Sequence, residues 1–143
     1  MIITDSGFWF GLFDRRDAYH PACCAFLKQC DESLITTFPV LTEAFHLLTS
    51  RNNSRLALEL LALLIKLQKQ GDFSLFSLAE SHLPRLEQLM IQYKDLPMDL
   101  ADGSLVLLAD HLGHGRIIST DRRDFHTYRW KNHLPFTNLL ELY

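Results

Sequence analysis

The stretch PMDLADGSLVLLADHLGHGRIISTDRRDF, residues 97–125, places a helix pattern, a break and a strand pattern in immediate succession. Pro97 precedes a strongly helical pattern over residues 98–112, and Gly113 ends it. Residues 115–119 then form a short, isoleucine-containing run that is typical of a buried strand. This stretch therefore predicts a helix that leads directly into a strand of a covered sheet.

The same alternation of short strands and helices continues through the rest of the chain. Strands are expected at residues 1–4, 34–37, 73–76 and 115–119, with one more edge strand within residues 134–142. Helices are expected over residues 8–13, 18–30, 40–50, 55–70, 79–93 and 98–112. Strands that alternate with helices predict a parallel sheet with right-handed crossovers. The expected fold class is therefore α/β, a three-layer α/β/α sandwich with a short-stranded parallel sheet.

Length and composition are those of one globular domain over residues 1–143, with 48% hydrophobic and 22% charged residues. The N-terminal residues lack the basic region of a secretory signal. The apolar segment at residues 56–67 is shorter than the roughly 20 residues that cross a bilayer, so it predicts a buried helix. We therefore expect a cytoplasmic protein with no membrane segment.

Net charge and cysteine content restrict the kinds of partner and site that the sequence allows. The net charge is −3, so a nucleic-acid partner would have to be held locally, by arginines or a metal. Cys23, Cys24 and Cys30 are an odd set without CxxC spacing. They indicate neither a disulfide framework nor a zinc site.

Acidic residues are expected to gather at one edge of the sheet. They follow strands or lie near the start of the next helix: Asp5, Glu43, Asp99, Asp102, Asp121 and Asp124. In parallel α/β sheets the functional site lies at the carboxyl ends of the strands. Gathered carboxylates repel one another unless a cation is present, and an oxygen donor set without Cys or His points to Mg²⁺ or Mn²⁺. Such a metal can activate a bound water and polarise a phosphoryl oxygen, as phosphodiester hydrolysis requires.

Each acid taken alone also has a structural explanation. Asp99 and Asp102 suit the positive end of a helix dipole, Asp124 suits a helix N-cap, and Glu43 suits a solvated helix surface. For Asp99 and Asp124 taken singly, the structural explanation is preferred. Only the joint placement favours a site.

Four segments resemble the PIN domain, and specifically the VapC-type ribonucleases of bacterial type II toxin–antitoxin systems. They are Asp5 in IITDSGFWFGLFDRRDAYH, Glu43 in LTEAFHLL, Asp102 in PMDLADGSLVLLA and Asp121 in IISTDRRDF. The resemblance covers the whole chain. It implies a PIN-like fold and a Mg²⁺- or Mn²⁺-dependent endoribonuclease in which these four acids are catalytic.

The resemblance also implies individual roles. Asp5, Asp102 and Asp121 would hold the metal, and Glu43 would bind through water or a second ion. Hydroxyl groups that hold these acids or waters, and additional supporting acids, are implied at Ser6, Thr120, Asp99 and Asp124. One departure is Gly103, where the family commonly has Ala, at a cost in helix propensity of up to about 1 kcal/mol.

The sequence also offers candidate contacts for RNA and for a protein partner. Arg15, Arg16, Arg122 and Arg123 adjoin two strand ends and are candidates for phosphate contact, or else solvated charges that balance nearby aspartates. The segment RLALELLALLIKLQ follows a polar break at residues 51–54, with Ser54 as its expected N-cap. It predicts either a helix buried in the monomer or one covered by a second subunit or an antitoxin. The resemblance favours the interface, and thus a homodimer with an antitoxin partner.

Alternative functions are a metal-dependent DNA nuclease, a non-toxin PIN-domain nuclease of RNA processing, a phosphatase and a non-catalytic binding module. A phospho-aspartate phosphatase would need DxD near the first strand, where the chain has DSG. The sequence also lacks a glycine-rich phosphate loop and a GxSxG elbow. The presence of all four acids disfavours a module without chemistry.

Overall fold

A five-stranded parallel sheet forms the centre of the protein. The computed structural model describes residues 1–51 and 54–142. The sheet has the order β3-β2-β1-β4-β7, and every neighbouring pair is parallel. Its strands are β1 (Ile2–Thr4), β2 (Leu34–Thr37), β3 (Phe73–Phe76), β4 (Arg116–Ile118) and β7 (Thr137–Asn138). The expected edge strand near the C-terminus is therefore present.

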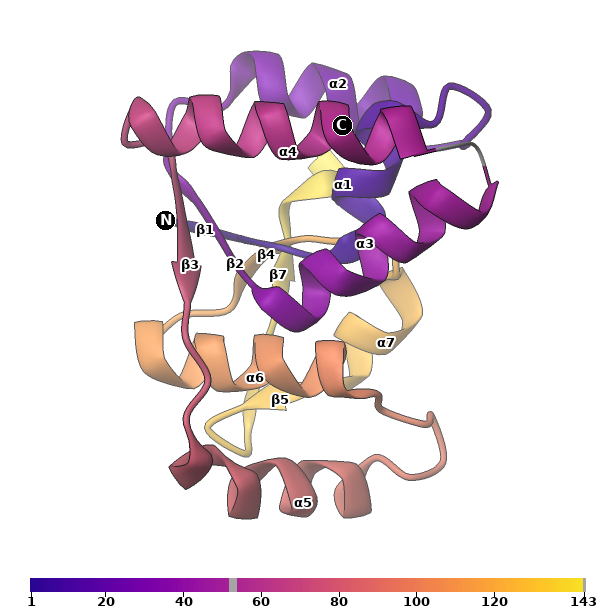
Figure 1. Ribbon diagram of the computed structural model, residues 1–143. Coiled ribbons are helices and arrows are strands. Elements are labelled where there is room, and N and C mark those ends of the chain that lie inside the picture. Colours follow the sequence, from indigo (N-terminus) through magenta and orange to yellow (C-terminus); the bar gives the residue numbers. More distant parts are fainter. Residues whose placement is uncertain (52–53, 143) are drawn as a thin grey trace.

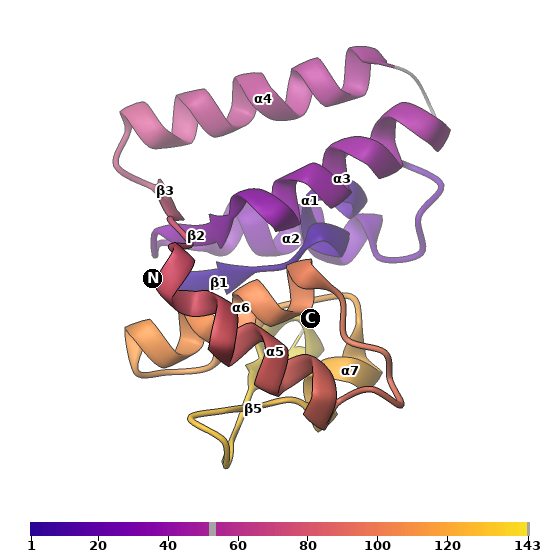
Figure 2. The same cartoon turned by 60° about the horizontal axis from the view of Figure 1, so that its bottom comes forward.

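Helices cover both faces of the sheet, as Figures 1 and 2 show. One face carries α1 (Ser6–Phe13), α2 (His20–Gln29), α3 (Phe38–Arg51) and α4 (Ser54–Lys69). The other carries α5 (Leu83–Gln92) and α6 (Leu100–Leu112). The remaining elements are α7 (Arg122–Thr127), the antiparallel pair β5 (Arg129–Trp130) and β6 (Leu134–Pro135), and the 3₁₀ turns η1 (Glu80–His82) and η2 (Leu139–Leu142). The predicted three-layer α/β/α class is confirmed.

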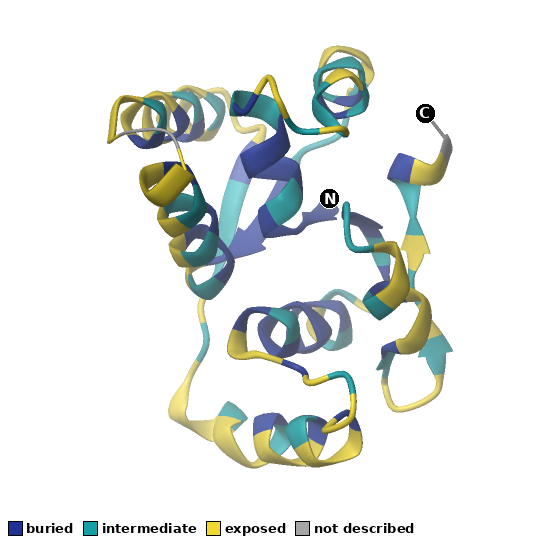
Figure 3. Ribbon diagram, turned by 90° about the vertical axis from the view of Figure 1, so that its right-hand side faces the viewer, coloured by how far each residue is buried: buried dark blue, intermediate teal, exposed yellow. Residues whose placement is uncertain are grey.

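Two residues of the central helix α6, Gly103 and Ser104, determine how it packs against its neighbours. It is buried over most of its length, whereas α5 outside it is largely exposed (Figure 3). Ser104 of α6 shares a hydrogen bond of 2.6 Å with Thr37 at the end of β2. Gly103 allows α5 to pack closely, because a Cβ there would lie 2.9 Å from Leu86 Cδ2. These contacts set the position of the α6 N-terminus over the carboxyl edge of the sheet.

The expectation of a buried helix at residues 56–67 is wrong. Helix α4 buries Ala57, Leu60 and Leu64 against the protein. Leu61 and Ile65 are 44% and 43% exposed, because α4 is an outer element in which only one side faces the core. The alternative in which the monomer buries this helix completely is thereby excluded.

Two other boundaries differ from the sequence expectation. The helix expected from residue 79 begins at Leu83, after η1, and a further helix, α7, follows β4 where none was expected. Helix α4 begins at Ser54, and the rest of the expected break, residues 52–53, lies outside the described residues. Among the helices of the described part, none is long and apolar enough to span a bilayer.

Candidate active site

A cavity of about 340 Å³ opens at the carboxyl edge of the sheet, beside the neighbouring strand ends of β1 and β4. Strand β1 leads to β2 on one side and β4 leads to β7 on the other, so the cavity lies where the strand order reverses. The structure brings all six predicted acids together in its wall, and it adds Asp17 from the loop after α1. The acids that line it are Asp5, Asp17, Glu43, Asp99, Asp102, Asp121 and Asp124.

Asp5 is held at the cavity floor by hydrogen bonds from two segments. Its side chain caps α1 by accepting the Ser6 N–H at 2.7 Å, and its second carboxyl oxygen accepts the Ser119 hydroxyl at 2.8 Å. Burial nevertheless dominates and raises the pKa of Asp5 to about 6. The fold therefore fixes this carboxyl in a place where its negative charge is costly.

Asp102 lies one turn into α6 and faces the same cavity. Asp99 caps the helix by accepting the Asp102 N–H at 2.8 Å, and the Tyr128 hydroxyl donates to Asp102 Oδ2 at 3.0 Å. Burial, and then the charges of Asp99 and Asp5, raise the pKa of Asp102 to about 8. The hydrogen bond from Tyr128 opposes that rise.

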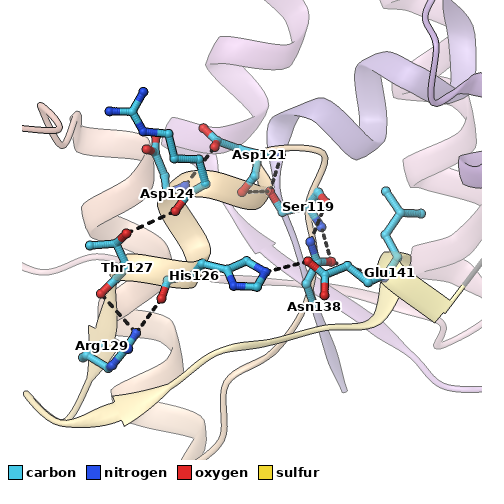
Figure 4. A network of polar contacts seen from close by, with 10 residues as sticks. Ser119, Asp121, Asp124, His126, Thr127, Arg129, Asn138 and Glu141 are labelled. Atoms are coloured by element: carbon cyan, nitrogen blue, oxygen red, sulfur yellow. Dashed lines mark hydrogen bonds and ion pairs between the residues drawn. The ribbon is translucent and has the colours of Figure 1, made fainter.

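Asp121, not Asp124, is the N-cap of α7, which corrects the capping role expected of Asp124. The Asp121 side chain accepts the Asp124 N–H at 3.1 Å, and its own N–H donates to Ser119 Oγ at 2.9 Å. Ser119 is in turn clamped by the Asn138 side chain, which bonds its N–H at 3.2 Å and its carbonyl at 2.8 Å (Figure 4). Burial and the neighbouring Asp121 raise the pKa of Asp124 to about 6.

Glu43 and the two predicted hydroxyl residues complete the cavity wall. Burial, followed by the charges of Asp99 and Asp5, raises the pKa of Glu43, and a hydrogen bond with the Ser6 side chain opposes the rise. Thr120 packs against Gly7, where a Cβ would collide with the Thr120 hydroxyl oxygen.

Comparison with known proteins supports the fold. Neither a protein-family model nor a curated protein sequence matches this chain. The crystal structure of VapC20 from Mycobacterium tuberculosis, a toxin that cleaves the sarcin-ricin loop, does match, with a TM-score of 0.76. The match covers 86% of this chain and 92% of that chain at 16% sequence identity. The fold is PIN-like, of the VapC type.

Within this PIN-like fold, the predicted arginines lie around the acidic cavity and not in it. Arg122 stacks over the Tyr19 ring at 5.7 Å, and Arg123 is exposed on α7. Arg15 and Arg16 line a neighbouring cavity together with Arg51, which lines both cavities. Arg51 was not anticipated from the sequence.

Sequence reasoning also missed the residues that hold the acids of the candidate site in place. Ser119 directly precedes Thr120, and its position at the end of a buried strand was the available signal. Tyr128 and Asn138 reach the site from segments beyond α7 and β4, so no local pattern marks them. Asp17 lines the cavity but was not among the acids expected to form the site.

The donor set fits a hydrated divalent cation. Across residues 1–51 and 54–142, no three or more His, Cys, Asp or Glu side chains are arranged to hold a metal ion by themselves. Mg²⁺ usually keeps several waters and takes one or two carboxylates, so acids spread around a cavity suit it better than a closed cage. The raised pKa values of Asp5 and Asp102 mark carboxyls that a cation would relieve of charge repulsion. The ligand set Asp5, Asp102 and Asp121 stays a prediction.

Proposed function

We propose that this protein is a Mg²⁺- or Mn²⁺-dependent endoribonuclease and the toxin of a toxin–antitoxin pair. The observation that carries the proposal is the cavity lined by seven carboxylates at the carboxyl edge of the sheet, in a VapC-type PIN-like fold. Seven carboxylates beside one arginine, Arg51, among the described residues that line the cavity suit a metal-assisted attack on a phosphodiester bond.

The proposed chemistry assigns roles to the four predicted catalytic acids. A divalent cation bound by Asp5, Asp102 and Asp121 would activate water and polarise the phosphoryl oxygen. Ser6 and Ser119 orient Asp5, and Tyr128 orients Asp102. The raised pKa of Glu43 brings this side chain closer to neutrality, as a group that takes up or releases a proton requires.

Positive charge for the RNA chain is proposed to come from Arg15, Arg16, Arg122 and Arg123. All four side chains are exposed near the cavity and can approach phosphates. This local charge would offset the net charge of −3 of the whole chain.

Helix α4 is proposed to be the protein interface. Its exposed Leu61 and Ile65 line an apolar hollow of about 470 Å³ together with Phe38, which is itself 65% exposed. Exposed apolar side chains that gather in one place are typical of partner-binding surfaces. A second subunit or an antitoxin helix would cover this face.

The test is RNA cleavage by the purified chain with Mn²⁺, using total RNA and an RNA that carries the sarcin-ricin loop. We expect Asp5→Asn and Asp102→Asn each to lower the rate by at least about a hundredfold, since each removes a charge that holds the metal. The exposed acid Glu87 on α5 gives the matched control, Glu87→Gln, which should leave the rate unchanged. Circular dichroism checks that every variant is folded.

Three results would contradict the proposal: full activity in either Asn variant, full activity in excess EDTA, or cleavage of single-stranded DNA with no cleavage of RNA. The last result would favour the alternative of a metal-dependent DNA nuclease. Mapping the cut sites in total RNA then separates a toxin with one target from a nuclease of general RNA processing.

A further inference from the structure

We propose that a second cavity, beside the acidic one, binds a phosphate group of the RNA strand next to the phosphate that is cleaved. This inference rests on the proposed function and adds a substrate subsite to it. The cavity has a volume of about 720 Å³ and lies between the loop after α1, the end of α3 and the start of α4. Its charged lining is four arginines, two acids and a histidine: Arg15, Arg16, Arg51, Arg55, Asp14, Glu59 and His20.

The two cavities differ in the sign of their charge and share one arginine. Arg51 lines both of them, and its guanidinium lies 5.3 Å from the centre of the Phe10 ring, which also lines the acidic cavity. In the part of the chain that the structure describes, Arg51 forms no ion pair with a carboxylate. The Arg51 guanidinium therefore lies between the negative and the positive cavity and is available to bind an anion.

The wall of the positive cavity is built by specific contacts between its elements. Buried Asp14 accepts the Arg16 N–H at 3.0 Å, and the Arg16 guanidinium reaches the Arg51 carbonyl at 3.4 Å, which ties the loop after α1 to the end of α3. On the same side of the cavity, His20 Nδ1 bonds the Gly11 carbonyl at 2.7 Å. The arginines are therefore presented by an ordered frame.

The fourth arginine, Arg55, takes part in an exposed ion pair. It lies 3.7 Å from Glu59, one turn further along α4, and the two side chains are 77% and 48% exposed. Exposed ion pairs of this kind contribute little and exchange easily for a better partner. A phosphate group offers oxygens that match the guanidinium fork.

An RNA strand fits this pair of cavities better than an acidic peptide does. A strand carries a phosphate at every nucleotide, so one phosphate can meet the metal in the acidic cavity while a neighbour meets Arg51 and Arg55. An acidic peptide in the same path has no phosphodiester bond to place in the acidic cavity, so it would use only the positive one. The arrangement therefore assigns the arginine-lined cavity to the nucleic-acid backbone.

The first test is RNA binding by the full chain in excess EDTA, measured by fluorescence anisotropy with a short labelled single-stranded RNA. The variants are Arg51→Gln, Arg55→Gln and the double variant, and the control is Lys69→Gln, an exposed cation at the other end of α4. We expect the double variant to weaken binding about tenfold and to reduce the slope of log affinity against log salt by about 0.7 per arginine, whereas Lys69→Gln leaves both unchanged. Glu59→Gln should tighten binding.

The proposal is overturned if the double variant binds RNA like the parent, or if Lys69→Gln weakens binding equally, since that would indicate a diffuse field. It is also overturned if an acidic peptide, and not RNA, binds in a manner that depends on Arg51 and Arg55.

A second test separates this subsite from the proposed nuclease activity. In Mn²⁺, Arg55→Gln should raise KM for RNA about threefold with kcat unchanged, because Arg55 lines only the positive cavity and supplies one of the two arginines of the subsite. Binding through the arginines without any cleavage would refute the nuclease and leave the subsite standing. Cleavage with unchanged KM in Arg55→Gln would refute the subsite and leave the nuclease standing.

Discussion

At the scale of single residues, the hydrogen bond from Tyr128 to Asp102 opposes the raised pKa of the Asp102 carboxyl. Burial and neighbouring acids raise the pKa of Asp102 to about 8, and the Tyr128 hydroxyl at 3.0 Å opposes that rise. A carboxyl must lose its proton before it can bind a metal. If the proposed metal binds at Asp102, the hydroxyl extends the range of pH in which it does so.

The first prediction is that Tyr128→Phe shifts the acid limb of the pH–activity profile to higher pH. Loss of the hydroxyl raises the pKa of Asp102 further, so the rate at neutral pH should fall about tenfold if the limb moves by about one pH unit. The measurement is kcat/KM for RNA against pH with Mn²⁺. Tyr93→Phe is the matched control, because the Tyr93 ring packs edge-to-face against Tyr128 but its hydroxyl accepts the Arg129 backbone N–H. Identical profiles for Tyr128→Phe and the parent would refute this role.

The second prediction concerns Gly7, which lies against Thr120 at the cavity wall. Gly7→Ala would place a methyl group inside the van der Waals radius of Thr120 Oγ1 and should destabilise the protein by about 2 kcal/mol. Removing that oxygen in Gly7→Ala/Thr120→Ala leaves a contact of 3.1 Å with the Thr120 Cβ, so part of the stability should return. Urea unfolding measures both changes. A double variant less stable than Gly7→Ala would count against this packing.

The positions of the acids were predictable from sequence, but the contacts that hold them were not. Asp5 directly follows β1, and Asp121 comes shortly after β4, beyond Ser119 and Thr120; parallel strands bring such positions to one edge. Tyr128, at the end of α7, reaches Asp102, and Arg51, at the end of α3, reaches both cavities, and these contacts depend on the whole fold. Local patterns report the periodicity of a segment and not its distant neighbours.

At the scale of elements, the sequence pattern did not predict which side of α4 is exposed or that α7 is a helix. The leucine-rich sequence of α4 shows only that many faces are apolar, whereas its outer place in the fold decides which side chains stay exposed. Helix α7 has six residues, too few for a clear period, and it is started by the Asp121 cap. The core strands were predictable because burial on both faces requires continuous apolar runs.

The third prediction tests α4 as an interface. Leu61→Lys/Ile65→Lys introduces two charges into its exposed apolar face, so a dimer formed there should dissociate to monomers at micromolar concentration. Sedimentation velocity measures the oligomeric state. Leu83→Lys is the control, since Leu83 is 64% exposed on α5 across the sheet and should leave the state unchanged. A parent protein that is monomeric at micromolar concentration would refute the dimer at once.

At the scale of the whole molecule, the gathered acids make folding stability depend on pH and on metal. The pKa values of Asp5, Asp124 and Asp102 rise from 3.8 to about 6, about 6 and about 8 on folding. The folded chain therefore keeps protons that the unfolded chain has already lost. The stability that these protons contribute is complete below pH 3.8 and is lost as the pH rises through 6 and then 8.

The fourth prediction follows from this linkage. In EDTA the stability contributed by these groups should fall between pH 5 and pH 8, and Mg²⁺, which competes with the protons, should raise Tm more at pH 8 than at pH 5. Asp102→Asn should reduce the loss of stability between pH 5 and pH 8 and raise the Tm of the metal-free protein at pH 8. It should also reduce the rise in Tm that Mg²⁺ causes. Glu87→Gln, on the exposed side of α5, should change none of these quantities. Thermal unfolding by circular dichroism across this pH range measures all of them. Equal Mg²⁺ effects in Asp102→Asn and the parent would show that the cation binds elsewhere, because the carboxyl with the highest pKa would then play no part in holding it.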